Sequence, residues 1–168
     1  MDLHTIWPHR WITPKAKSFK SHIAGLGVVA IKDISKGETV LVYGGVIVPK
    51  SDIIKYRKKL GHSGIQVDDG FFLIPTDREE LKRTGIVNHS CNPNAGFKNS
   101  VVMIALRSIK KGEEVTFDYA FSESYFESFN CGCKSRNCRG IVKPTDWKIK
   151  NLQNKYGQYF SPYLKNKH

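Results

Sequence analysis

The sequence predicts a mostly β, α+β fold built from several small sheets, and three observations support this. Short runs rich in β-branched residues recur along the chain, glycine-containing turns separate them, and helical periodicity is confined to three short segments. The 168 residues suffice for one domain with its own core, and a hydrophobic content of 40% is ordinary for a globular protein. We therefore expect a single β-rich domain.

Five or six strands are expected from the β-branched runs. Glycine-bearing turns such as Asp33–Glu38 separate consecutive runs, as in antiparallel sheets. The runs are GLGVVAIKDI (25–34), ETVLVYGGVIV (38–48), FFLIP (71–75), VVMIALRSI (101–109) and EEVTFDYAF (113–121).

Two turns resemble each other in sequence. ISKGETV (34–40) is similar to IKKGEEV (109–115), and each precedes a β-rich segment that carries a tyrosine. Two hairpin turns of the same chemistry explain this similarity better than a duplicated unit, since the chain shows no longer repeat period.

Three segments carry helix signals. SDIIKYRKKLG (51–61) begins with Ser and Asp as caps and ends at Gly61. TDREELKRTG (76–85) predicts a short capped helix, and TDWKIKNLQNKYG (145–157) predicts a helix from an N-cap at Thr145 to Gly157.

The chain is strongly basic, with a net charge of +12 and a pI near 9.6. This charge favours an anionic partner such as nucleic acid, an acidic protein surface or a phosphate- or carboxylate-bearing small molecule, although a merely soluble basic surface explains it as well. No apolar stretch approaches the ~20 residues that span a bilayer, and the first residues lack the apolar core of a secretion signal. We therefore expect no membrane association and an intracellular protein with reduced thiols.

The four cysteines predict a metal site. Cys131, Cys133 and Cys138 have the spacing C-x-C-x4-C, which is typical of zinc ligands and too tight for an easy disulfide between the first two. Tetrahedral zinc needs a fourth ligand, which either Cys91 or His89 can supply. With four protein ligands no coordination position is open, so this one Zn²⁺ would be structural.

Two further motifs are ambiguous from spacing alone. Gly25 and Gly27 precede a strand, but no third glycine or helix follows, so a dinucleotide-binding loop is excluded and a turn is favoured. In GIVNHSCNPN (85–94), Asn88 fits a local turn and His89 a hydrogen-bonded core residue. A local turn does not explain why a candidate metal ligand lies two residues after His89.

Taken in chain order, four motifs resemble those of SET-domain protein lysine methyltransferases with a post-SET zinc motif. They are AGLGVVAIKDISKGETVLVYGG, GIVNHSCNPN, IKKGEEVTFDYAF and CGCKSRNCRG. The compact size and the C-terminal segment are most similar to short stand-alone bacterial SET proteins. The resemblance implies several small sheets with a knot-like crossing of the chain. It divides the sequence into an N-terminal extension (1–17), a SET domain (18–121), a post-SET zinc segment (122–143) and a C-terminal helix and tail (144–168).

The resemblance also implies roles for individual residues. Tyr119 would be the catalytic tyrosine at the mouth of a lysine channel, Tyr43 would contact the substrate amine, and Phe117 would occupy the position that controls the degree of methylation, with phenylalanine permitting di- or trimethylation. Val46 departs from the family, which often has glutamate there. S-adenosylmethionine would be bound by Gly25, Leu26, Gly27, Asn88, His89 and Tyr119, and zinc by Cys91, Cys131, Cys133 and Cys138.

The implied reaction is an in-line methyl transfer to a deprotonated lysine amine. Because the unperturbed lysine pKa is ~10.4, the channel must lower it by desolvation and by the nearby sulfonium cation. The implied partner is a protein presenting a lysine, such as a histone, a nucleoid-associated or a ribosomal protein, with nucleic acid nearby. Location would be the cytoplasm or nucleoid if bacterial, and the nucleus if eukaryotic or secreted into a host.

A different class of function is a zinc-stabilised basic module that binds nucleic acid or protein without turnover. A basic tail is a poor match for a +12 enzyme unless its groove is acidic. Residues available for such an acidic patch are Asp68, Asp69, Asp77, Glu79, Glu80, Glu123 and Glu127. The last residues, YGQYFSPYLKNKH (156–168), either pack over the cleft or form a solvated tail.

Overall fold

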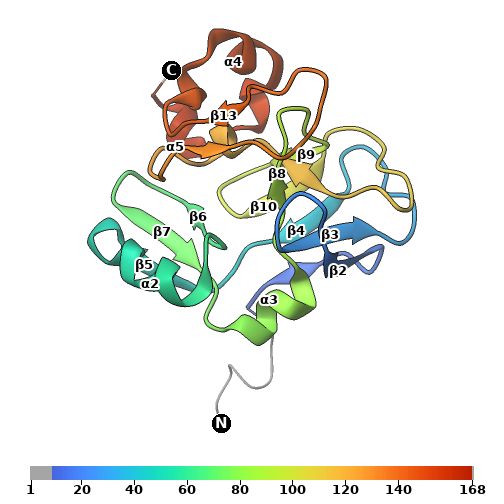
Figure 1. The fold of residues 1–168 in the computed structure, drawn as a ribbon, viewed down its shortest axis with the longest axis horizontal. Coiled ribbons are helices and arrows are strands. Elements are labelled where there is room, and N and C mark those ends of the chain that lie inside the picture. The colour runs from blue at the N-terminus through green and yellow to red at the C-terminus, as the bar shows by residue number, and fades with distance from the viewer. Residues whose placement is uncertain (1–8, 168) are drawn as a thin grey trace.

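Small sheets dominate the structure, a computed structural model that describes residues 9–167, so part of the predicted N-terminal extension lies outside it (Figure 1). The mostly β fold predicted from the sequence is confirmed. The described strands form one four-stranded sheet, one three-stranded sheet and three two-stranded sheets. Many of these strands have only two residues and pair with distant segments, which is why local patterns indicated fewer strands.

The four-stranded sheet forms the centre of the core. Its order is β1 (Trp11–Ile12), β4 (Thr39–Val42), β10 (Val102–Ala105) and β9 (Ala95–Phe97), and every pair is antiparallel. Met103 lies opposite Leu41 on one side and Phe97 on the other. All three side chains are fully buried, so this register fixes the core.

Two antiparallel sheets flank the central sheet. One is the hairpin of β2 (Ala16–Lys20) and β3 (Leu26–Ala30), and the other has the order β5 (Val46–Pro49), β7 (Phe71–Ile74) and β6 (Ile65–Gln66). The run 38–48 is thus two strands in different sheets. The first strand ends and the second begins on either side of Gly44 and Gly45. A Cβ on Gly44 would lie 1.4 Å from the carbonyl oxygen of His9, and Gly45 has a φ of +136°, so both positions favour glycine.

The last two sheets join segments that are distant in sequence. β8 (Asn88–His89) pairs in parallel with β11 (Thr116–Phe117), and β12 (Phe129–Asn130) pairs antiparallel with β13 (Ile141–Val142).

Two helices lie at one end of the molecule. A single 3-10 turn, η1 (Lys50–Asp52), leads into α2 (Ile53–Leu60), which ends at Gly61 with a φ of 71° as predicted. Asp52 makes no side-chain capping bond there, contrary to the prediction. α3 (Arg78–Thr84) is capped as predicted, because the Asp77 carboxylate accepts from the amide of Glu80 at 2.7 Å.

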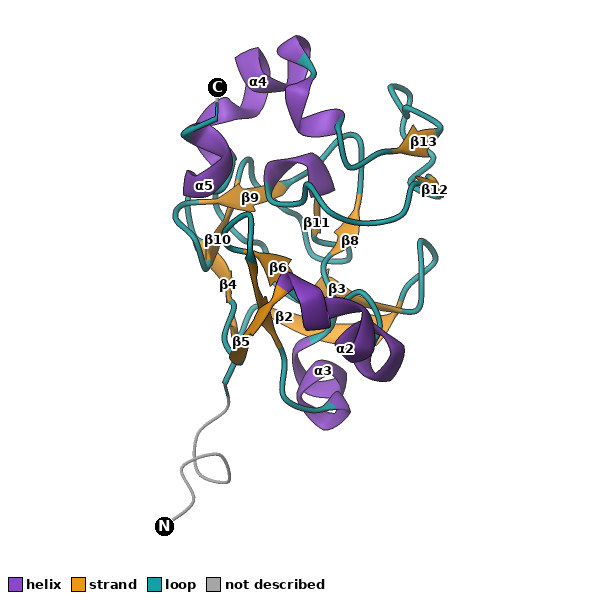
Figure 2. Ribbon diagram, turned by 90° about the vertical axis from the view of Figure 1, so that its left-hand side faces the viewer, coloured by secondary structure: helices purple, strands orange, loops and turns teal. Residues whose placement is uncertain are grey.

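The C-terminal segment lies at the opposite end of the molecule (Figures 1 and 2). The helix predicted over 145–157 is divided at Ile149, because the backbone of this residue is extended. Thr145, the predicted N-cap, makes no side-chain capping bond. The segment contains η3 (Asp146–Lys148), α4 (Lys150–Tyr156), η4 (Gly157–Tyr159) and α5 (Pro162–Lys165).

This segment is part of the core and not a solvated tail. Phe160 and Leu164 are fully buried, and the Phe160 ring lies 5.0 Å from that of Phe121 in η2 (Tyr119–Phe121). The amide of Ser161 donates to the carbonyl of Phe121 at 2.7 Å. None of the helices in residues 9–167 is long and apolar enough to cross a membrane.

The two similar turns meet in the structure. Ile34 and Ile109 exchange both backbone hydrogen bonds at 2.9 Å. The amide of Gly37 donates to Ala105, and that of Gly112 donates to Ala30, each at 2.8 Å. Each turn thus forms the same backbone hydrogen bonds to the segment that contains the other turn. This equivalent pairing explains why the two turns have similar sequences.

The buried isoleucine pair predicts a stability test. Ile109→Ala should lower the free energy of unfolding by about 2–5 kcal/mol, because the fully buried side chain leaves a cavity. The exposed Ile47 provides the matched control, and its replacement by alanine should change the value by about 0.5 kcal/mol or less. Urea unfolding measures both, and equal effects would contradict the proposed role of the turn pair.

Candidate functional site

The site is organised around the crossing of β8 and β11. Thr116 lies opposite Asn88, and Phe117 lies opposite His89. Asn94 holds the crossing, because its Oδ1 accepts from the amide of Thr116 at 2.8 Å and its Nδ2 donates to the carbonyl of Glu114 at 2.8 Å. The stretch 85–94 is therefore more than a turn, since its side chains tie two distant segments together.

Asn88 binds the glycine-containing loop before β3. Its Nδ2 donates to the carbonyls of Ala24 and Leu26, each at 3.1 Å, and to Glu114 Oε1 at 2.9 Å. A Cβ on Gly27 would lie 2.6 Å from that Glu114 oxygen, so in this structure close packing requires glycine there. The predicted residues Gly25, Leu26, Gly27 and Asn88 are thereby brought together.

His89 connects the crossing to the cysteines. Burial lowers its pKa to about 4, so the ring is neutral. Its Nδ1 accepts from the amide of Tyr119 at 3.2 Å, which leaves the proton on Nε2, 3.3 Å from Cys91 Sγ. His89 therefore orients a cysteine sulfur instead of completing the cysteine cluster.

The four cysteines form one cluster, as predicted. The sulfurs of Cys91, Cys131, Cys133 and Cys138 all lie within 4.8 Å of one another, and those of Cys91 and Cys131 are 3.8 Å apart. Tetrahedral zinc with Zn–S bonds of about 2.3 Å needs sulfurs about 3.8 Å apart, so this donor set fits one Zn²⁺. The cluster is positioned to bind zinc through four thiolates.

Arg139 joins this cluster to the chain just before Tyr119. Its guanidinium forms two hydrogen bonds, at 2.6 and 2.8 Å, with the fully buried Asp118, and its Nε donates to Asp146 at 3.0 Å. Its amide also lies 3.3 Å from Cys91 Sγ. The sequence motifs gave no role to this arginine, although it directly follows the last cysteine.

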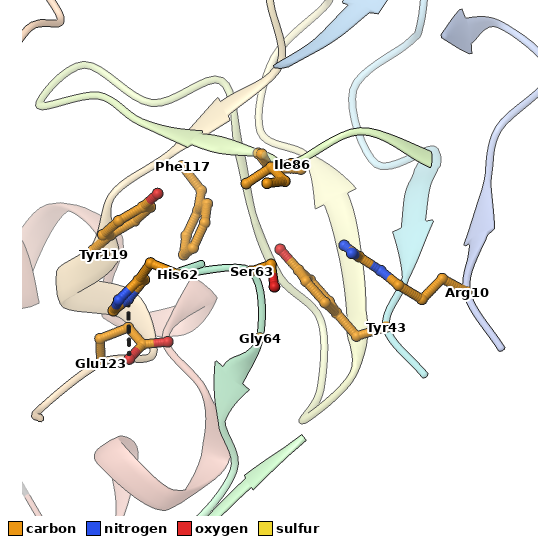
Figure 3. Close-up of a pocket in the computed structure, with 10 residues that line it drawn as sticks. Arg10, Tyr43, His62, Ser63, Gly64, Ile86, Phe117, Tyr119 and Glu123 are labelled. Carbon is orange, nitrogen blue, oxygen red and sulfur yellow. Dashed lines mark ion pairs between the residues drawn. The ribbon is translucent and has the colours of Figure 1, made fainter. Parts of the chain in front are cut away.

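A narrow pocket lies between the predicted catalytic residues. Tyr43, Phe117 and Tyr119 line it, and it has room for about one water molecule (about 10 Å³). Figure 3 shows Tyr43 on one side and Tyr119 on the other, with Phe117 between them. Burial raises the pKa of Tyr43 and of Tyr119 above its ordinary value, so both hydroxyls remain protonated.

A cavity of about 600 Å³ adjoins this pocket, and His62 and Tyr119 line both. The ring of His62 stacks on Tyr119 with a centroid distance of 5.7 Å. Of the six residues predicted to bind the cofactor, Tyr119 alone lines the cavity. The other residues of its wall are Ile54, Arg57, Lys58, Tyr125, Phe126, Glu127 and Phe129.

Glu123 also lies in the site, although the sequence indicated it only as a candidate for an acidic surface patch. This residue is 2% exposed and lines the narrow pocket beside His62. Burial raises its pKa to about 8 and lowers that of His62 to about 4. No local pattern marks either residue as functional.

The acidic residues considered for a surface patch differ in burial and in their partners. Glu80 and Glu123 are buried, while Asp77 caps α3. Glu79 pairs with Lys82, and Asp69 pairs with Lys167. Glu123 and Glu127 line the two adjoining pockets, and Glu123, Asp68 and Asp69 all raise the pKa of Tyr163. An acidic groove formed by part of this set therefore stays a prediction.

Sequence comparison gives the class of protein. The SET domain model matches residues 25–120, more than half of the 168-residue chain. The chain belongs to the SET domain family, as its motifs indicated.

Known relatives are larger proteins. The histone-lysine N-methyltransferase trithorax of Drosophila virilis is 35% identical over 133 residues, which cover 72% of this chain and 3% of the relative. The histone-lysine N-methyltransferase ASHH3 of Arabidopsis thaliana is 29% identical over 151 residues, covering 80% of this chain and 40% of the relative. The chain thus spans less than half the length of either.

Solved structures agree on the fold. KRYPTONITE in complex with DNA, an H3(1-15) peptide and SAH superposes with a TM-score of 0.59 at 21% identity, over 78% of this chain and 30% of that chain. The methyltransferase domain of human SETMAR gives a TM-score of 0.54 at 20% identity, over 74% and 56% of the respective chains.

The cysteine cluster predicts a metal-dependent stability. We expect one zinc per chain by elemental analysis, and Cys138→Ser should lose it and lower the melting temperature by about 10 °C or more, because a structural site contributes directly to folding. Ser128→Ala, an exposed change on the same segment, should retain the metal. A metal-free wild-type protein with unchanged stability in chelator would contradict this prediction.

Proposed function

We propose that the chain is an S-adenosylmethionine-dependent protein-lysine N-methyltransferase. The observation that carries this proposal is the position of Tyr119 on the wall shared by the large cavity and the narrow pocket. Two ligands that enter from the two spaces would meet at this residue. Membership of the SET family and the names of the relatives support the same reaction.

The large cavity is the proposed cofactor space. Its volume of about 600 Å³ is typical of small-molecule sites, and its aromatic residues Tyr125, Phe126 and Phe129 suit an adenine ring. His89 lies behind Phe129, with a centroid distance of 6.1 Å. We propose that Gly25, Leu26, Gly27, Asn88, His89 and Tyr119 complete the site, as the family resemblance implies. When bound, the cofactor supplies an activated methyl group on a sulfonium.

The narrow pocket is the proposed end of the lysine channel. Tyr43 and Phe117 are almost fully buried, so an amine placed there loses most of its hydration. Desolvation lowers a lysine pKa and thereby favours the neutral amine that reacts. Protonated tyrosine hydroxyls orient the amine without adding negative charge.

The proposed product includes di- and trimethyl-lysine. Phe117 packs with its ring 5.0 Å from Tyr119 and 5.7 Å from Phe97 and is 3% exposed. Since phenylalanine brings no hydroxyl to this wall, it binds no water there, and the space that such a water would fill is left to the methyl groups of the amine.

The proposed substrate is a protein that presents a lysine, with histone, nucleoid-associated and ribosomal proteins as the classes to test. The relatives' names and the H3 peptide in one solved structure support a histone-like protein. An intracellular location, in the nucleus or nucleoid, follows from such a substrate. A zinc-stabilised binding module without turnover is the outcome if the protein binds no cofactor.

Tyr119→Phe tests the assignment directly. Loss of the hydroxyl should reduce methyl transfer from labelled S-adenosylmethionine by about 100-fold or more, because an oriented polar group at the reacting atoms is removed. Cofactor affinity by calorimetry should be nearly unchanged. Tyr156→Phe, the same change on α4, should retain activity, and a fully active Tyr119→Phe would refute the proposed site.

Phe117→Tyr tests product control. The added hydroxyl in a pocket with room for about one water should favour a single methylation, so mass spectrometry should show mostly monomethyl-lysine. An unchanged distribution of methylation states would refute the role assigned to Phe117.

A further inference from the structure

Glu123 is a buried carboxylate with unused hydrogen-bonding capacity. Within residues 9–167, its Oε1 accepts only a long bond of 3.3 Å from the amide of Gln66, and its Oε2 has no hydrogen-bond partner. A buried, unpaired oxygen is costly, so a structural role alone does not account for it. The side chain lines the same narrow pocket as Tyr43 and Tyr119 (Figure 3).

Two neighbouring side chains approach this oxygen without forming a short hydrogen bond to it. Arg57 Nη2 lies 3.5 Å from Oε2, while its Nη1 donates to the carbonyl of Tyr125 at 3.0 Å. His62 Nε2 lies 3.8 Å away and also lacks a hydrogen-bond partner in the described part of the chain. A structural ion pair would form short, paired bonds instead. The pocket therefore contains an acceptor suited to a cation with N–H donors.

The charge balance around Glu123 comes from several elements. Arg57 of α2 is the permanent cation nearest to Glu123, and the neutral His62 follows that helix. The guanidinium of Arg10 also lines the pocket, on the Tyr43 side, 5.1 Å from the centroid of that ring (Figure 3). Tyr43, Tyr119 and Tyr163 of α5 also face it, and the negative charge of Glu123 adds to burial in raising the pKa of each hydroxyl. These three groups remain neutral, so Glu123 is the group in this pocket that changes charge near neutral pH.

We infer that Glu123 binds the ε-ammonium group of the substrate lysine and accepts its proton before methyl transfer. This inference rests on the proposed methyltransferase function and adds a residue to it. The carboxylate oxygen takes the proton while the N–H electron pair stays on nitrogen, which yields a neutral amine and a neutral carboxylic acid. After the product leaves, the acid returns the proton to solvent.

Burial makes Glu123 an effective acceptor. Its pKa of about 8 is far closer to that of a lysine than an exposed carboxylate would be, so less free energy is needed for the transfer. Below this pKa the free enzyme carries the protonated acid and cannot accept a proton. Activity on a protonated lysine should therefore rise with pH up to about 8 and then level off.

The experiment compares wild type with Glu123→Gln, which keeps the size and removes the basic oxygen. The value of kcat/KM for a lysine peptide or protein identified with wild type is measured from pH 6.5 to pH 10. At pH 7 the variant should be at least about 10-fold slower. Above pH 8 its rate should keep rising about tenfold per pH unit, because it depends on free amine with a pKa of ~10.4, so the difference from wild type shrinks.

Controls separate this role from a structural one. Melting temperature and calorimetric cofactor affinity establish that Glu123→Gln folds. Glu123→Asp should restore part of the activity and the levelling of the profile, and Glu79→Gln, an exposed change on α3, should match wild type. If Glu123→Gln does not fold, the profile of Glu123→Asp decides.

Each outcome has a definite meaning. A Glu123→Gln enzyme as active as wild type, or one slower by the same factor at every pH, would overturn the inference while leaving the methyltransferase function intact. If only Glu123→Asp can be measured, a pH profile of kcat/KM that does not level off would overturn the inference. A wild-type protein that transfers no methyl group to any substrate would overturn both.

Discussion

The parallel pairing of β8 with β11 is the constraint on which the rest of the site depends. It places His89 beside Phe117 and sets Tyr119 two residues beyond the crossing. Asn94 and Asn88 stabilise the pairing from the side, through Thr116 and through Glu114. Because the paired strands have two residues each, backbone bonds alone would hold the crossing weakly. The polar side chains supply the remaining hydrogen bonds, which explains why a buried segment is so rich in asparagine.

The cysteine cluster and Arg139 fasten the C-terminal half onto this crossing. Cys91 lies two residues after His89, and the neutral imidazole donates to its sulfur. Arg139 connects Asp118 with Asp146, so the chain before Tyr119, the cysteine segment and η3 are held by one guanidinium. A metal bound here would stabilise the wall of the large cavity, since Phe129 of that wall belongs to the strand that leads into Cys131.

The site combines protonated tyrosines with one buried acid. Burial raises the pKa of all three groups: it keeps Tyr43 and Tyr119 neutral, and it brings the pKa of Glu123 to about 8. A pocket of this kind suits a lysine ammonium group and favours its conversion to the neutral amine.

The sequence by itself determined the β-rich class, the SET family and three of the cysteines in the cluster, because each of these depends on residue types at short, characteristic spacings. It left the fourth ligand open between Cys91 and His89, and the roles of Tyr43, Phe117 and Tyr119 follow from the family resemblance. Only the tertiary structure decided the two-residue pairings, the division of the run 38–48 at Gly44 and Gly45, and the burial of Phe160 and Leu164. It also revealed Glu123, His62 and Arg139. Their roles arise from contacts between segments far apart in the chain and from burial, and neither is encoded in any local pattern.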